Sequence, residues 1–248
     1  MEGLGRRLAS GVGVLTSVWV RHVARTATLR VVGAEGSVDA DRTCAPFTRA
    51  LLDDAARGHA IVSFWSADQV AIALLAAERF GLRPALERYE VVADDSFGGE
   101  MMHALGHRLG LRMRLIHASG ARRLADVGAW IRNPGPFFIA VDGGTTYGTV
   151  PTGMVRLAAR LRSRVWPVAV RARHAARVPG LVAHVPMPAT SVVLAVGAPM
   201  LVERTMPVAE VAGELTHRLD ATTALAEASL YGRLASRDYE TERWRRTV

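Results

Sequence analysis

Short apolar runs alternate with helix-like patterns along most of the chain. Runs of apolar and β-branched residues predict strands at 28–32, 61–65, 89–93, 111–117, 137–141, 165–171 and 191–196. Apolar residues spaced three or four apart predict helices at 46–56, 70–80, 99–109, 151–162, one ending near 131 and two after 207, with an irregular surface stretch at 178–189. This alternation is typical of βαβ units. The sequence therefore predicts an α/β fold with a single mostly parallel sheet flanked by helices on both faces.

The N-terminal segment 8–20 is apolar and has arginines at both ends. It is shorter than the roughly 20 apolar residues that cross a bilayer. We expect an interfacial, membrane-associating helix whose arginines lie at the headgroups and whose acyl-facing side chains are Val14, Leu15, Val18 and Trp19. The alternative is an ordinary core helix with basic ends. The predicted organisation is an interfacial helix at 1–26 followed by one α/β domain at 27–248.

Composition narrows the choice of partners. All 31 basic residues are arginine and the net charge is +8, which favours anionic partners. A basic motif interleaved with aromatic residues is missing from the sequence, so an anionic membrane surface is favoured and nucleic acid is not. The single cysteine, Cys44, excludes an intramolecular disulfide and an all-cysteine metal site. We expect a peripheral protein on the cytoplasmic face of the membrane, with no cofactor and no metal.

Polar residues follow two of the predicted strands. Ser66 comes after the second strand and Asp142 after the fifth. Ligands bind at the carboxyl ends of strands in such sheets, so both are candidate catalytic residues. His103 is a third candidate, because a Ser66–His103–Asp142 triad needs only a hydrolase-like geometry. The backbone amides of Gly143 and Gly144 can cradle an oxyanion or a phosphate; the alternative is a glycine turn capped by Asp142.

Two predicted helices carry further polar patterns. Glu100, His103 and His107 share one helix face and could bind zinc, but no further ligand is evident, and a solvated face is the favoured alternative. The other helix carries a basic stripe made of Arg156, Arg160 and Arg164. Such a stripe can assist docking to an anionic surface, and again the alternative is a solvated face.

Six short motifs occur in a fixed order: Phe64-Trp65-Ser66, Asp95–Glu100, Leu109-Gly110-Leu111, Ser119–Arg122, Val141–Thr146 and Val150–Gly153. Together with the N-terminal helix, this order resembles the glycerol-3-phosphate and lysophospholipid acyltransferase superfamily, most closely a bacterial branch of mostly uncharacterised members. The family motifs are Phe-Trp-His, Ser/Asp-Gly-Glu, Leu-Gly-Leu, a basic loop with serine, Pro-Asp-Gly-Pro-Arg-Gly and Lys-Pro-Gly. The resemblance covers roughly residues 8–200.

The resemblance implies an activity and a set of contacts. The activity is transfer of a fatty acyl group from acyl-CoA or acyl carrier protein to a lipid hydroxyl, so the partners are an acyl thioester and a lipid acceptor. The implied substrate-binding residues are Trp65, Ser96, Gly98, Glu100, Ser119, Arg122, Gly143, Gly144 and Thr145.

Two departures from the family pattern affect its chemistry. Ser66 stands where the family has its general-base histidine, and Ala71 stands where many members have the acid that orients it. A serine hydroxyl does not accept a proton near pH 7, so the usual mechanism would lose about 10²–10⁴-fold in rate. Thr145 replaces the arginine that binds phosphate.

Two hypotheses of function remain. The first is a lysophospholipid-type acyltransferase, with His103 as a substitute base. The second is a catalytically inactive acyltransferase fold that binds a lipid, or a protein partner, at the membrane. An acyl-transfer assay with a Ser66→His variant distinguishes them.

Overall fold

The computed structural model describes residues 2–34, 43–57, 60–88, 90–116, 137–142, 148–177 and 183–231. The helices are α1 (Glu2–Thr26), α2 (Ala45–Arg57), α3 (Gln69–Leu74), α4 (Arg83–Arg88), α5 (Phe97–Arg108), α7 (Thr152–Leu161) and α8 (Val208–Tyr231), with short 3-10 helices η1 (Ser66–Asp68) and η2 (Glu78–Phe80). The strands are β1 (Thr28–Gly33), β2 (Ala60–Phe64), β3 (Glu90–Asp94), β4 (Arg112–Ile116), β5 (Phe137–Ala140), β6 (Arg164–Ala172), β7 (Ala175–Arg177), β8 (His184–Pro186), β9 (Ser191–Val196) and β10 (Met200–Leu201).

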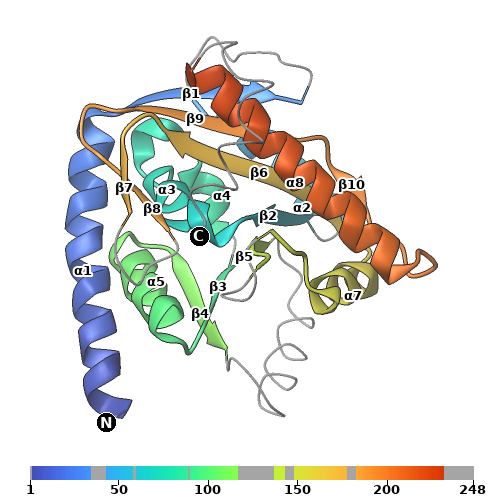
Figure 1. The fold of residues 1–248 in the computed structure, drawn as a ribbon, viewed down its shortest axis with the longest axis horizontal. Helices are drawn as coiled ribbons and strands as arrows, with labels where there is room; N and C mark the ends of the chain where they lie inside the picture. Colours follow the sequence, from blue (N-terminus) through green and yellow to red (C-terminus); the bar gives the residue numbers. More distant parts are fainter. Residues whose placement is uncertain are drawn as a thin grey trace, which may run out of the picture.

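A mixed sheet of mostly parallel strands forms the centre of the fold, in the order β1-β9-β6-β2-β5-β3-β4 (Figure 1). β2 pairs in parallel with β5 and β6, and β3 pairs in parallel with β4 and β5. β9 is antiparallel to β6, because the chain returns through the β7–β8 hairpin and not through a crossover helix. The predicted α/β class and the mostly parallel sheet are confirmed.

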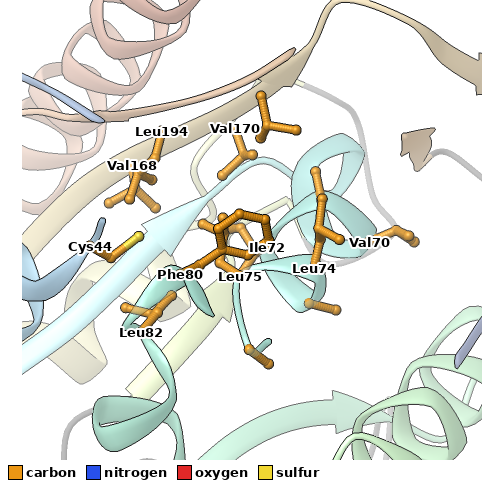
Figure 2. Packing of buried hydrophobic residues seen from close by; sticks show 14 of the residues in the cluster. Cys44, Val70, Ile72, Leu74, Leu75, Phe80, Leu82, Val168, Val170 and Leu194 are labelled. Atoms are coloured by element: carbon orange, nitrogen blue, oxygen red, sulfur yellow. The ribbon is translucent and has the colours of Figure 1, made fainter. Parts of the chain in front are cut away.

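Helices cover both faces of this sheet. Along β2, Val62 and Phe64 belong to a core cluster shared with α1, α2 and α3, whereas Ile61 belongs to a second cluster shared with α7 and α8. Figure 2 shows part of the first cluster, with residues of the segment after β2 close to residues of β6. Because every residue of β2 is buried, this strand lies at the centre of the molecule.

One face of α1 is part of the protein core. A Cβ atom added at Gly13 would clash with the carbonyl oxygen of Met101 and lie 2.8 Å from the Cβ of Ala104, so the α1 and α5 backbones are in close contact. Ala9 and Val20 on the same side are buried. A helix is present where we predicted one, and α1 spans Glu2–Thr26. One of its faces packs in the core, and its association with a membrane stays a prediction.

The other face of α1 carries apolar side chains in contact with solvent. Leu8, Leu15 and Val18 are 57%, 71% and 62% exposed. Trp19, which we expected to face lipid, is half-buried, and its Nε1 donates a hydrogen bond to the carbonyl of Pro186 at 2.9 Å. None of the described helices combines the length and apolarity that crossing a membrane requires.

Some predicted elements differ from those observed. The helix predicted at 70–80 is divided into α3, a turn and η2. Residues 70–76 are all buried, so the segment packs on every side and does not have the one apolar face of the single helix that we predicted. The stretch 178–189 contains β8, which pairs with β7. The sequence pattern does not predict α4, β7 or β10. The helix predicted to end near 131 lies outside the described residues.

Candidate functional site

The pairing of β2 with β5 brings Ser66 and Asp142 together. Phe64 and Ala140 are partners in the parallel register and are the last residues of their strands, and in each segment a polar side chain follows two residues later. The backbone N–H of Val141 donates to the carbonyl of Phe64 at 2.9 Å, which extends the pairing beyond the strand end. Ser66 and Asp142 therefore leave the sheet at the same level of its carboxyl edge.

Two hydrogen bonds join the two residues. The backbone N–H of Ser66 donates to Oδ1 of Asp142 at 2.7 Å, and its Oγ–H donates to Oδ2 at 2.8 Å. Both residues are buried, with exposed fractions of 6% and 1%. The serine hydroxyl thus directs its only proton at the carboxylate, while its lone pairs remain able to accept a hydrogen bond from another hydroxyl group.

A buried ionic cluster holds η1, the turn that carries Ser66. Asp68 is fully buried; its Oδ1 accepts from Nη1 of Arg171, and its Oδ2 accepts from the backbone N–H of Val170 at 3.3 Å. Nε of Arg171 also donates to Oε1 of Glu227 on α8 at 3.2 Å. The cluster links η1 to β6 and α8. The sequence pattern signals this cluster only through Asp68, because a carboxylate within a buried apolar stretch needs a buried partner; its partners Arg171 and Glu227 were not predicted.

Burial controls the protonation of two groups near this cluster. Removal from water raises the pKa of Asp68 to about 6, against the lowering effect of Arg171 and of the hydrogen bond from Val170. Burial also lowers the pKa of His184 to about 4, and the charges of Arg171 and Arg177 act in the same direction. His184 is therefore neutral at pH 7.

Helix α5 begins just after the carboxyl end of β3, and a side-chain hydrogen bond caps its first turn. Ser96 is the N-cap residue, and its side chain accepts a hydrogen bond from the backbone N–H of Gly99 at 3.2 Å. Gly98 and Glu100 follow in the first turn, half-buried. The sheet order places β5 between β3 and β2, so these residues lie along the same edge as the pair, beside the end of β5 that carries Asp142 and one strand further from Ser66.

The remaining predicted residues lie in different places. His103 is half-buried on α5, and within the described residues no hydrogen bond joins it to Ser66 or Asp142. Trp65 is buried in the core cluster with Ile61 and Phe137. Five candidates fall outside the described residues: Ser119, Arg122, Gly143, Gly144 and Thr145.

In the part of the chain that the structure describes, no three His, Cys, Asp or Glu side chains are grouped so that they could hold a metal ion. Glu100, His103 and His107, the candidate zinc ligands on one helix face, are among the side chains that form no such group. No protein-family model matches the sequence, and no curated protein is significantly similar to it. Any functional conclusion therefore rests on the site itself and on the order of the motifs.

Proposed function

We propose that this chain is an acyltransferase-like protein that binds an acyl lipid at an anionic membrane surface without catalysing the base-driven transfer of that family. The observation that carries the proposal is the hydrogen bond from Ser66 Oγ to Asp142 Oδ2, at 2.8 Å. In the motif order, Ser66 occupies the position of the general base. A group that donates its proton to a neighbouring carboxylate is not a proton acceptor there.

The missing general base would make a large contribution to the rate of acyl transfer. Positioned general bases contribute about 10²–10⁴-fold to a rate. His103 does not supply this contribution through Ser66 or Asp142, since it bonds to neither in the described residues. Binding of an acyl lipid needs no base, only an apolar site and a polar group that orients the ester. The Ser66 Oγ lone pairs are suited to that second task.

The surface formed by α1 and α5 supports the membrane part of the proposal. Gly13 lies against Ala104, and further along Nη2 of Arg21 donates to the carbonyl of Arg108, so the two helices run in the same direction. Phe97 is 49% exposed and lies four residues before Met101, and Leu8 lies five residues before Gly13, so both precede the contact between the helices by little more than one helical turn. Phe97 follows the last residue of β3 by three positions, and Figure 1 shows α5 beside α1.

A second function is favoured by the same pair of residues. Ser66 can relay a proton: an acceptor hydroxyl gives its proton to Ser66 Oγ as the Ser66 proton passes to Asp142. The acceptor oxygen then forms the new ester bond to the thioester carbonyl carbon, the C–S bond breaks, and the leaving thiolate takes the proton from Asp142. This is acyl transfer with a carboxylate as the base in place of an imidazole.

One assay separates the two functions. Purified protein is given labelled acyl-CoA or acyl carrier protein with lysophospholipids, and binding of a fluorescent fatty-acyl lipid is measured in parallel. The proposal expects lipid binding without turnover, and turnover in Ser66→His if the remaining site is complete. Turnover in the wild type that is lost in Asp142→Asn and in Ser66→Ala overturns the inactive form and establishes the relay. If the protein neither binds the lipid nor turns over the substrates, both functions are overturned.

A further inference from the structure

A cavity of about 320 Å³ lies where α1, α5 and the turn after α3 meet. Its apolar wall includes Val20, Ala24, Ala76 and Ala77, and the small alanine side chains leave the space open. Its residues include neither Ser66 nor Asp142. Gly110 on its rim lies two residues before β4, at the end of that strand opposite to the carboxyl edge. It is therefore a separate site, and the inference below does not depend on the proposed function.

Basic side chains from three helices surround this cavity: Arg21 of α1, Arg83 of α4, and His107 and Arg108 of α5. Arg83 also reaches Gly110, where its Nη2 would lie 3.5 Å from an added Cβ atom. Glu87 takes one hydrogen bond from Nε of Arg83 at 2.7 Å. In the described residues, the side chain of Arg108 makes no hydrogen bond or ion pair with the protein.

The carbonyl groups at the C-terminal end of α5 do not repel an anionic ligand in this cavity. The last carbonyl groups of a helix normally lack partners and carry partial negative charge. Here the carbonyls of Leu105, Gly106 and His107 accept from the backbone N–H groups of residues 109–111. The carbonyl of Arg108 accepts from Arg21. The exposed guanidinium of Arg108 is engaged by none of these carbonyls and can interact with a ligand.

We propose that this cavity binds the phosphate group of a ligand with a short apolar part. The arginines supply charge-assisted hydrogen bonds to phosphate oxygens, and the alanine and valine side chains accept the apolar part. Two sources share this chemistry: the headgroup of an anionic lipid, and a soluble phosphate ester. Arg21 lies on α1 three residues after the exposed Val18, so a membrane-bound α1 would bring the cavity to the level of lipid headgroups.

Two probes separate these sources. Butyl phosphate and inorganic phosphate are titrated into the full chain by calorimetry, and vesicles of phosphatidylcholine with and without phosphatidic acid are tested by sedimentation. We expect butyl phosphate to bind about tenfold more tightly than inorganic phosphate, because its carbons enter the apolar part of the cavity. Binding to phosphatidic acid alone, with no soluble ligand bound, identifies the lipid headgroup as the source.

Three variants test the location. Arg108→Gln removes a charge, Ala77→Leu fills the cavity without changing charge, and Arg49→Gln removes an exposed arginine on α2, away from the cavity lining, as a control. Thermal melts establish that each variant is folded. In whichever arm binds, Arg108→Gln and Ala77→Leu should each weaken binding about tenfold, and Arg49→Gln should not. The proposal is overturned if neither arm binds, if Ala77→Leu has no effect, or if Arg49→Gln weakens binding as much as Arg108→Gln.

Discussion

Asp142 accepts both hydrogen bonds that Ser66 can donate, one from the backbone N–H at 2.7 Å and one from the hydroxyl at 2.8 Å. The two residues lie 76 positions apart in the sequence. Their strands are neighbours in the sheet, and both side chains are buried. The pair therefore fixes the first residues after β2 and β5 relative to each other, whatever reaction or ligand the site serves.

Stability should depend more on Asp142 than on Ser66. Asp142→Ala leaves the N–H and the hydroxyl of Ser66 buried without their acceptor, so we expect the free energy of unfolding to fall by about 2–4 kcal/mol. Ser66→Ala removes one hydrogen bond and leaves the other, and we expect a loss of about 1 kcal/mol. Urea denaturation measures both. If Asp142→Ala is as stable as the wild type, the pair has no structural role.

The burial of Asp68 makes the stability depend on pH. Because burial raises its pKa from 3.8 to about 6, the folded protein binds this proton more tightly than the unfolded chain does. The stabilising contribution is fully present below about pH 4 and is lost as the pH rises through about 6, a change of up to about 3 kcal/mol. Arg171 opposes the rise in pKa, and the charge of Glu227 adds to it.

Denaturation of the wild type and of Asp68→Asn between pH 4 and pH 7 tests this linkage. The difference in unfolding free energy between the two proteins should change in favour of the wild type as the pH falls. Other titrating groups, His184 among them, contribute to both proteins and cancel in the difference. Glu227→Gln should move the transition to lower pH, because it removes a charge that raises the pKa of Asp68. A difference independent of pH would contradict the assignment.

The sequence predicts the parts of this site that depend on local order. Ser66 and Asp142 each follow an apolar run, and parallel strands bring such ends to one edge, so their proximity could be expected. The position of His103 could not, because helix periodicity gives the face of α5 but not which strand lies beneath it. Asp68, Arg171 and Glu227 come from three distant segments, and only the packed sheet brings them together.

The contact between α1 and α5 predicts opposite effects at two glycines of one helix. A Cβ atom at Gly13 would meet the carbonyl of Met101 and the side chain of Ala104, so Gly13→Ala must separate the helices and should cost about 1–3 kcal/mol. A Cβ atom at Gly11 meets nothing within 4 Å, so Gly11→Ala should stabilise the protein by about 0.5–1 kcal/mol. Thermal or urea denaturation compares them. Equal effects would mean that α1 does not pack on α5 as described.

Membrane association should depend on the exposed face of α1. Leu15 and Val18 are 71% and 62% exposed and make little contribution to the core, so replacing them by aspartate should change stability by less than about 0.5 kcal/mol. Each change exchanges an apolar group for a negative charge next to anionic lipid. We therefore expect sedimentation with anionic vesicles to weaken about tenfold for either variant.

The matched control lies on another part of the surface. Leu201 of β10 is 45% exposed, and Leu201→Asp adds the same charge without altering α1. If α1 is the docking element, Leu201→Asp should retain nearly all vesicle binding. If the net charge of +8 alone drives association, all three aspartate variants should weaken it equally, and raising the salt concentration should abolish it. A different result would show that apolar insertion of α1 holds the protein at the surface: the wild type stays bound at high salt, and Leu15→Asp does not bind.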